Sequence, residues 1–455
     1  MTRDAGRTGR VAVIGGGWSG LACAVALADA GVEVTVLEAA DTLGGRARRV
    51  DHAGISLDNG QHLLLGAYAQ TLAMIHKVQP DARAADLYSR IPLCIAGPGR
   101  FSLRAAPLPA PWHMFFGLLT ARDCTWAERL AVARGFGDWK KAGWRAAPDM
   151  TVAQLLHGQP ARISDRLWTP LCLAALNTPP ASASAQVFLN VVRDGLAGAR
   201  SGSDLVIPVA DLSRLFPEPA AAFVTKKGGV VRTHARVRAI VADGGGVVVR
   251  SAAHGGADPA AGIANGGDRS ERFAAAVIAT APWQASHLLA GIPGIDRVLT
   301  QIDAYGYEPI CTIYLRFEER VELAHPMLQL AGRPGQWVFE RTTAAAGESW
   351  LAVVISTDGA HRALSHEQLA RDAVAELRDA LQMPGLPEPS AARVIIERRA
   401  THVCTPSRVH PVAGAIAERI YIAGDHTDPD YPATLEAATR SGVRAAEAVL
   451  AARRR

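Results

Sequence analysis

Cysteine is scarce in this sequence of 455 residues, and its six cysteines are far apart, with no C-x-x-C pair among them. That spacing fits neither a zinc site nor the disulfide framework of a small secreted domain, so we expect free, buried thiols in a reducing compartment. A G-x-S-x-G elbow is missing too, since Gly17-Trp18-Ser19-Gly20 lacks the closing glycine, and this argues against serine-hydrolase chemistry. The cysteines are Cys23, Cys94, Cys124, Cys172, Cys311 and Cys404.

Long apolar runs and long basic runs are also absent. No uninterrupted apolar stretch approaches the roughly 20 residues of a transmembrane helix, and the basic residues are scattered apart from residues 453–455. Residues 1–10 are polar and basic but lead into a strand, not into the apolar core of a signal peptide. We therefore expect a cytoplasmic protein that does not bind nucleic acid. Its formal net charge of +5 is compatible with a peripheral position on the inner, anionic face of a membrane.

The most informative stretch is residues 11–20, where a short apolar run turns into glycine and then into an apolar helix. Gly15, Gly17 and Gly20 give the G-x-G-x-x-G spacing, in which a backbone turns sharply, approaches a pyrophosphate and packs a helix against a strand. Amide groups at the start of that helix, around Trp18 and Ser19, would face the phosphates. The stretch predicts a Rossmann-like dinucleotide site.

A second apolar run, at residues 32–37, ends at Glu38, which lies 18 residues after Gly20. A carboxylate at this position accepts a hydrogen bond from an adenosine ribose hydroxyl and disfavours a phosphate there. FAD or NAD is therefore preferred to NADP.

Two further segments carry glycine and polar side chains close to the dinucleotide motif. Gly44 and Gly45 remove side chains where a backbone passes close to a cofactor, and Arg46 could neutralise phosphates or touch the flavin ring. Residues 58–62, with the sequence Asp-Asn-Gly-Gln-His, repeat the pattern of a strand end, a turn and polar groups. We interpret both segments as parts of one cofactor site.

Apolar side chains make up 49% of the sequence, enough for a large core in two or three domains. We predict an α/β fold in which a Rossmann-like domain is built from residues 1–81, 205–290 and 401–455. Residues 82–204 carry helical patterns and are predicted to form a cap, and residues 291–400 are predicted to form an antiparallel substrate domain. The aromatic run at residues 112–119 would either dip into a bilayer or line a pocket or core.

The second and third parts of the predicted Rossmann-like domain contain their own strand signals. Residues 232–241 and 246–250 indicate a hairpin, and the Gly- and Ala-rich residues 251–270 a mobile surface loop. A strand at residues 276–280 precedes Pro282, which is typical of the start of a helix. Near the C-terminus, residues 420–425 form another apolar strand that ends in Gly-Asp, and a helix follows at residues 433–450.

These separated elements together resemble the superfamily of FAD-dependent amine oxidases and phytoene desaturases across nearly the whole chain. The resemblance rests on residues 15–20, 38, 44–46, 58–62, 424–425 and 434–436. It implies an amine oxidase-like flavoprotein with FAD as cofactor, in which Val237 meets the adenine. The cofactor-binding residues that it implies are Gly15, Gly17, Trp18, Ser19, Gly20, Glu38, Ala39, Gly45, Arg46, Gly60, Gln61, His62, Val237, Gly424, Asp425, Thr434 and Leu435.

Within that superfamily the chain looks most similar to the squalene-associated desaturases, the hydroxysqualene dehydroxylases. The segments that carry this resemblance are residues 58–68, 168–178, 204–212 and 431–436. Amine oxidases usually place an aromatic residue of the substrate cage beside a glycine in the last segment, and this chain has no such arrangement.

This resemblance implies reduction of the isoprenoid hydroxysqualene to squalene, with loss of water and hydride supplied by FAD, and it implies squalene-pathway enzymes as partners. His62, Asp58 and His426 are candidates for the proton donor that hydroxide departure needs. The open alternatives are a phytoene-type carotenoid desaturase, an amine or porphyrinogen oxidase, and a flavin-stabilised lipid-binding protein without turnover. No metal site is expected.

Overall fold

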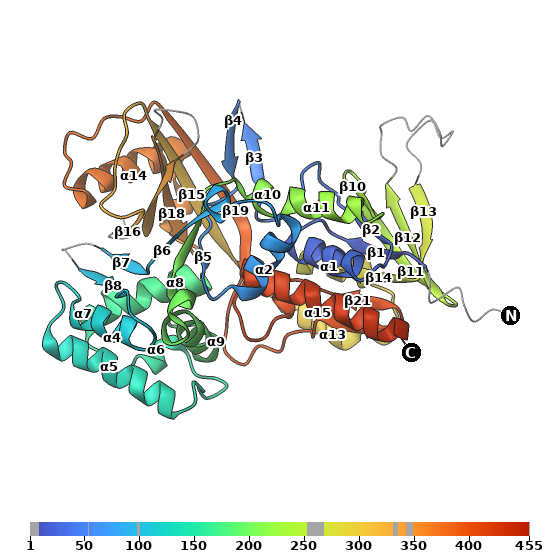
Figure 1. Cartoon of the computed structure of the whole chain (residues 1–455), viewed down its shortest axis with the longest axis horizontal. Coiled ribbons are helices and arrows are strands. Elements are labelled where there is room, and N and C mark those ends of the chain that lie inside the picture. The colour runs from blue at the N-terminus through green and yellow to red at the C-terminus, as the bar shows by residue number, and fades with distance from the viewer. Residues whose placement is uncertain are drawn as a thin grey trace.

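The fold comes from a computed structural model that describes residues 9–52, 54–97, 101–252, 268–330, 335–342 and 349–454. Figure 1 shows three bodies: a parallel sheet with its helices, an antiparallel sheet with one helix, and a helical region. The predicted α/β class, with a Rossmann-like part and an antiparallel part, is confirmed by this arrangement. The domain boundaries at residues 81, 204, 290 and 400 stay predictions.

A six-stranded sheet brings together the two ends and the middle of the chain. Its order is β10 (Val230–Arg232), β2 (Val34–Leu37), β1 (Val11–Ile14), β14 (Ala275–Ile278), β21 (Ile420–Ile422) and β20 (Gly414–Ala417). All neighbours are parallel except β20, which pairs antiparallel with β21. The central strands are buried on both faces, which explains their continuous apolar sequence. Ligands of such sheets bind at the carboxyl ends of the strands.

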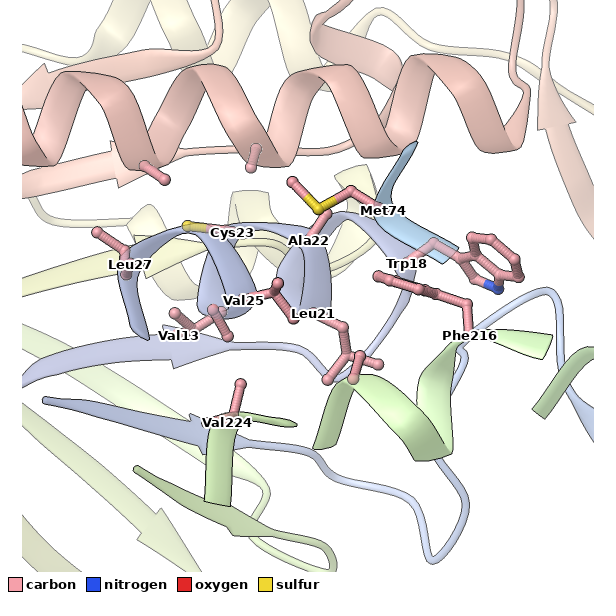
Figure 2. Packing of buried hydrophobic residues seen from close by; sticks show 14 of the residues in the cluster. Val13, Trp18, Leu21, Ala22, Cys23, Val25, Leu27, Met74, Phe216 and Val224 are labelled. Carbon is pink, nitrogen blue, oxygen red and sulfur yellow. The ribbon is translucent and has the colours of Figure 1, made fainter. Parts of the chain in front are cut away.

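Helix α1 (Trp18–Asp29) is almost wholly buried, and helices cover it from several sides. Figure 2 shows the Trp18 ring beside Phe216, which lies immediately before α11 (Pro217–Lys226), with ring centroids 4.9 Å apart. The C-terminal helix α15 (Leu435–Arg454) crosses α1 at Gly442, where a Cβ atom would lie 2.1 Å from the carbonyl oxygen of Ser19. Helix α2 (Ala69–Val78) contributes Met74 to the same cluster.

A separate three-stranded sheet contains the predicted hairpin, with one difference. Strands β11 (Val237–Asp243), β12 (Gly246–Ala252) and β13 (Asp268–Phe273) pair antiparallel. Residues 230–232, which we expected partly in the hairpin, instead form β10 of the parallel sheet, and the chain turns before Val237. The ends of the predicted surface loop, residues 251–252 and 268–270, belong to strands, while residues 253–267 lie outside the described ranges. Helix α12 (Pro282–Leu289) begins at Pro282 as predicted, and α13 (Asp296–Asp303) follows it.

The second large sheet has five antiparallel strands in the order β16 (Met327–Gln329), β17 (Trp337–Thr342), β18 (Ser349–Ser356), β15 (Tyr307–Phe317) and β19 (Ala391–His402). Helix α14 (His366–Ala380) covers one face through Leu369, Ala373 and Leu377, which alternate at helical spacing and are fully buried. The other face packs against the helical region. The predicted antiparallel sheet is therefore present.

The region between α2 and α11 combines short helices with small sheets. Its helices are α3 (Ala84–Leu87), α4 (Trp112–Leu119), α5 (Trp126–Lys141), α6 (Val152–Leu155), α7 (Ala161–Ile163), α8 (Thr169–Leu176), α9 (Ala185–Val192) and α10 (Leu212–Leu215). Its strands are β5 (Leu64–Leu65), β6 (Tyr88–Ile91) and β9 (Leu205–Pro208) in one sheet, and β7 (Cys94–Ala96) with β8 (Ser102–Arg104) in another. The hairpin of β3 (Arg49–His52) and β4 (Ile55–Asp58) precedes this region in the sequence.

Two expectations from composition can be compared with the structure. All six cysteines are buried and free, as their spacing indicates. Within the described ranges, none of the helices is both long and apolar enough to cross a bilayer.

Candidate active site and cofactor cradle

The glycine motif forms a tight turn between β1 and α1. Gly15 has a φ of +107°, and a Cβ atom there would lie 2.7 Å from the carbonyl oxygen of Ala279. At Gly20 a Cβ atom would lie 2.0 Å from the carbonyl oxygen of Gly15. Neither position accepts a side chain, so the motif brings the start of α1 directly over the carboxyl ends of β1 and β14.

The Gly44-Gly45 segment lies against this turn. The amide of Gly44 donates to the carbonyl of Gly16 at 2.8 Å, and the nearest atom to a Cβ built on Gly17 is the Cα of Gly45, at 3.9 Å. Gly17 is also the N-cap of α1 and has no side-chain capping partner. The two segments therefore form a floor of bare backbone at a helix N-terminus, which suits a pyrophosphate.

Glu38 borders this floor at the end of β2. Its carboxylate accepts hydrogen bonds from the amides of Gly16 at 2.6 Å and Ala40 at 2.8 Å, so Ala39 is held in the turn between them. The amide of Ala235 donates to the carbonyl of Glu38 at 2.7 Å. Val237, two residues later, begins β11 beside the same turn. This places the predicted ribose acceptor and the predicted adenine contact on one side of the floor.

Arg46 and Asp425 form a buried ion pair between two distant parts of the chain. Their Nη2 and Oδ1 atoms are 2.6 Å apart, and a second Arg46 nitrogen donates to the carbonyl of Ala400 at 2.9 Å. Burial by itself raises the pKa of Asp425, but the Arg46 guanidinium together with the neighbouring His426 and His402 outweighs burial and holds that pKa far below its usual value. Asp425 is therefore a permanent anion next to Gly424, and Arg46 is positioned by it.

Asn59 connects the Arg46 segment to the Asp58-to-His62 segment. Its side chain donates to the carbonyl of Arg46 at 2.6 Å and accepts from the amide of Arg48 at 3.1 Å. One residue on, a Cβ atom at Gly60 would lie 3.6 Å from Thr312 Oγ1, on strand β15. The segment thus runs between the cofactor floor and the antiparallel sheet.

Asp58 is used for a buried ion pair. Its Oδ2 atom lies 2.6 Å from Arg341 Nη2, and its Oδ1 atom accepts from the amide of Leu212 at 2.8 Å. Tyr314 donates to its carbonyl oxygen at 3.1 Å. These contacts connect β4, β15, β17 and α10, so the carboxylate is already committed to holding these elements together.

His62 is half-buried and oriented by its own backbone. Its Nδ1 atom lies 2.8 Å from the carbonyl oxygen of Gly60, which can only accept, so Nδ1 carries the proton. Burial lowers the pKa of His62 below its usual value of 6.5, so the ring is neutral near pH 7. The Nε2 atom is therefore left without a proton in the neutral ring.

His426 follows Asp425 in a cluster of aromatic side chains that the sequence did not reveal. It is fully buried, and neither ring nitrogen has a hydrogen-bond partner in the part of the chain that the structure describes. The hydroxyl of Tyr305 donates to the His426 carbonyl at 2.6 Å and lies 2.9 Å from His410 Nδ1. Next to them, burial lowers the pKa of His402 to about 3. These residues are far apart in sequence, and no local pattern joins them.

Thr434 and Leu435 lie at the start of α15. Thr434 Oγ1 accepts from the amide of Ala437 at 3.2 Å and so caps the helix. Glu436, the last residue of the 434–436 segment that carries the family resemblance, accepts from the amide and hydroxyl of Thr71 at 2.9 and 2.8 Å and from the amide of Gln70 at 3.1 Å. Its carboxylate therefore caps helix α2.

The two side chains that follow Gly17 differ in whether their polar atom has a hydrogen-bond partner. The Trp18 indole packs into the α1 core and donates to the Ala47 carbonyl at 2.9 Å, so only its backbone can face a ligand. Ser19 Oγ, by contrast, is buried and has no partner in the described ranges.

We call the glycine floor, with Glu38, Arg46, residues 58–62 and Asp425, the cofactor cradle. Four polar side chains around this cradle each have a buried polar atom without a partner among the described residues. They are Ser19, Gln61, Thr280 and His426. Buried polar groups are normally hydrogen-bonded, so together with the bare glycine floor they indicate that a polar ligand belongs here. Thr280 was missed from the sequence, although it follows strand β14 at the same sheet edge as Gly15 and Gly424.

Comparison with known proteins now identifies the family. Residues 18–450 match the protein family described as "Flavin containing amine oxidoreductase". The chain belongs to this family. A hydroxysqualene dehydroxylase of Rhodopseudomonas palustris is 30% identical, with 98% of this chain and 99% of that protein covered. A 15-cis-phytoene desaturase of Synechococcus elongatus is 25% identical, with 97% and 96% covered. A solved structure of a putrescine oxidase triple mutant superposes with a TM-score of 0.73 at 17% identity, covering 98% and 99%.

Membership of the family of flavin-containing amine oxidoreductases makes this chain an FAD-dependent oxidoreductase, and FAD is its cofactor. Gly15, Gly17, Gly20 and Glu38 predicted a site for FAD or NAD, the family resemblance narrowed this prediction to FAD, and FAD is thereby confirmed. The residues present fit such a ligand, because the bare floor suits a pyrophosphate and the unpartnered polar atoms suit its polar groups. The individual contacts predicted from the sequence stay predictions.

Proposed function

We propose that this oxidoreductase reduces hydroxysqualene to squalene with loss of water. The observation that carries this proposal is the likeness to a hydroxysqualene dehydroxylase over nearly the whole of both chains, at 30% identity. In the overall reaction a C–O bond breaks, the hydroxyl leaves as water after taking up a proton, and a C–H bond forms at the same carbon. FAD in its reduced form supplies the hydride and is left oxidised.

The residues around the start of α15 support an isoprenoid in preference to an amine. Tyr431 is not free to line an aromatic cage, because its hydroxyl donates to Asp194 at 2.5 Å. Glu436 is turned toward α2. The side chain at the first position of the helix is Leu435, and leucine offers an amine nothing but apolar contact.

Different groups of the chain would bind different parts of FAD and of the substrate. Amides of the glycine floor and the N-terminus of α1 would hold the pyrophosphate, and Glu38 would hold the ribose. Arg46 and Asp425 would neutralise and hydrogen-bond the part of FAD between the phosphates and the flavin. The amide of Gln61 donates to Thr312 Oγ1 of β15 at 3.4 Å, so this site adjoins the antiparallel sheet, where we place the apolar tail of the substrate.

Among the three candidates for a proton donor, the geometry favours His62. Asp58 is held by Arg341 and Leu212, and His426 is wholly buried. With Nδ1 fixed on Gly60, His62 would deliver a proton from Nε2 after the ring is protonated. Because burial lowers its pKa, the protonated ring is a strong acid and is scarce at neutral pH. The rate should therefore rise as the pH falls from 7 toward the pKa of His62.

A second function is favoured by the likeness to 15-cis-phytoene desaturase, in which the same fold would remove hydrogens from a polyene. The position of the protein on the cytoplasmic face of a membrane, and contact with squalene-pathway enzymes, are further parts of the proposal.

The test uses the purified, FAD-loaded protein, reduced anaerobically with dithionite and mixed with hydroxysqualene in detergent. We expect flavin reoxidation and one squalene for each flavin, and a slower reaction in His62→Gln at unchanged flavin content. If hydroxysqualene leaves the flavin reduced while oxidised enzyme desaturates phytoene, the second function replaces the first. Reoxidation without squalene would also overturn the proposal.

A further inference from the structure

The apolar stripe of helix α4 faces outward and is exposed to solvent. Trp112, Phe115, Phe116 and Leu119 recur at helical spacing, and their exposed fractions are 54%, 52%, 38% and 37%. The three aromatic rings contact one another. The helix has no Asp, Glu, Lys or Arg, and its one ionisable residue, His113, is fully buried. An amphipathic helix normally turns such a stripe inward.

Further exposed apolar side chains lie next to this stripe. Leu108 precedes the helix at 37% exposure, and Trp126, at the start of α5, is 69% exposed. A hydrogen bond of 2.7 Å from Arg129 to the carbonyl of Ala121 holds the start of α5 against the end of the α4 segment. We call Leu108, Trp112, Phe115, Phe116 and Leu119 the α4 face. Figure 1 shows α4 and α5 at the end of the molecule remote from the parallel sheet.

Two exposed arginines lie at the β8 side of the α4 face. Arg104 on β8 is exposed, and its carbonyl oxygen lies 2.5 Å from where a Cβ of Gly117 would be, so it adjoins α4 directly. Arg122 is exposed and pairs with Ser102 of the same strand. In the described part of the chain neither arginine has an ion-pair partner. The nearby carboxylate of Asp123 is occupied by Arg162 and Arg166. The rim of the α4 face is therefore positive.

A mainly apolar pocket opens beside this face. Arg104 lines it together with Ile91, Leu205 and Met327, from β6, β9 and β16. Leu205 pairs with Leu65 of β5, which follows His62 by three residues. The pocket wall is thus continuous, through one strand pair, with the segment that approaches the cofactor cradle.

We infer that the α4 face docks on an anionic phospholipid bilayer and that the adjoining pocket admits the isoprenoid from it. Aromatic rings enter the interface between headgroups and acyl chains, and arginines at the rim pair with lipid phosphates. Only the identity of the entering lipid rests on the proposed function.

The test is sedimentation of the full-length, FAD-loaded protein with vesicles of phosphatidylcholine alone, or with phosphatidylglycerol added. We expect binding to the anionic vesicles only, weakened by salt. Combined Trp112→Ser, Phe115→Ser and Phe116→Ser should reduce binding at least tenfold, and Arg104→Gln with Arg122→Gln should reduce it severalfold. Val412→Ser is the matched control, because Val412 is 81% exposed on a different segment.

A second measurement keeps the inference testable if the triple variant folds poorly. Brominated lipids should quench tryptophan fluorescence of the wild-type protein, and Trp112→Phe, which keeps an apolar ring, should remove part of that quenching. Equal binding of the triple variant and the wild type, or binding by neither, overturns the inference. Conversion of a wild-type dimer to a monomer by the triple variant, without vesicle binding, overturns it in favour of self-association. Vesicle binding that persists in a protein unable to form squalene in detergent supports the surface and removes the proposed function.

Discussion

The cofactor cradle and the α4 face place their side chains in opposite ways. At the cradle, polar atoms such as Ser19 Oγ and both ring nitrogens of His426 are buried without partners in the described residues. On the α4 face, Trp112 and Phe115 are more than half exposed. Polar groups inside and aromatic groups outside both cost stability in water. Both costs are removed when a bound ligand pairs the buried polar atoms and when a surface outside the chain covers the exposed rings.

The largest effect on the cofactor cradle is expected from substitutions in the glycine turn. Gly20→Ala places a methyl group 2.0 Å from the Gly15 carbonyl oxygen and should cost about 3 kcal/mol or more, with loss of FAD. Gly17→Ala meets nothing closer than 3.9 Å, so the fold should persist while the added methyl group hinders the pyrophosphate. Thermal unfolding of both apoproteins, with FAD titration, separates the effects. Normal melting and normal FAD content in Gly20→Ala would contradict the tight turn.

The Asp58–Arg341 pair tests whether polar groups near the cradle serve the fold or the chemistry. Asp58→Asn leaves Arg341 buried without its counter-charge and should cost about 3 kcal/mol in urea unfolding. Turnover per bound flavin should change little, whereas loss of a general acid costs about 100-fold or more. Asp86→Asn, which breaks an exposed pair with Arg83, is the control and should cost less than about 1 kcal/mol. A large loss of turnover at unchanged stability would return Asp58 to the role of proton donor.

Acid should weaken the cradle more than the surface. Burial lowers the pKa of His402 to about 3 in the folded protein, whereas an exposed histidine in the unfolded chain has its usual pKa of 6.5, so the unfolded chain binds the proton more tightly. Stability is then lost as the pH falls below 6.5, by about 2 kcal/mol between pH 7 and pH 5 from this group. His402→Gln should lose correspondingly less on acidification, measured by urea unfolding at both pH values. The exposed His157 is the control site, and an unchanged acid loss in His402→Gln would contradict the prediction.

The smallest expected effect is at Glu436, which caps α2 from α15. Glu436→Gln keeps one acceptor oxygen but loses the charge near a helix N-terminus, and should cost about 1 kcal/mol. Flavin content should be unchanged, because the carboxylate faces α2. Glu447→Gln, on an exposed position of the same helix, should be neutral in thermal unfolding. Loss of FAD in Glu436→Gln at full stability would place this residue in the cradle after all.

Sequence alone predicted the features that depend on neighbouring residues. The spacing of Gly15, Gly17 and Gly20 and the acid at Glu38 predicted a site for FAD or NAD, because a turn and its strand lie close together in the chain, and the family resemblance selected FAD. The partners of Asp58 and Glu436 could not be predicted, since Arg341 and Thr71 come from remote segments that only the folded chain brings near. The aromatic run at residues 112–119 was noted with two alternatives, a bilayer or a pocket or core, because an apolar sequence does not say which way its side chains face.

The strand order of the parallel sheet has a consequence for how the protein is made. On the ribosome β1, α1 and β2 emerge first, while the neighbours on the other side of β1, which are β14 and then β21, come much later. At about 5–20 residues per second, β1 waits roughly 13–53 s for β14, its partner on that side, and Asp425 follows roughly 20–80 s after β1. Until β14 arrives this edge of β1 is open to the wrong partners, and until residue 425 is made the cradle lacks the Asp425 carboxylate. FAD can therefore bind at a complete site only after residue 425 has been synthesised.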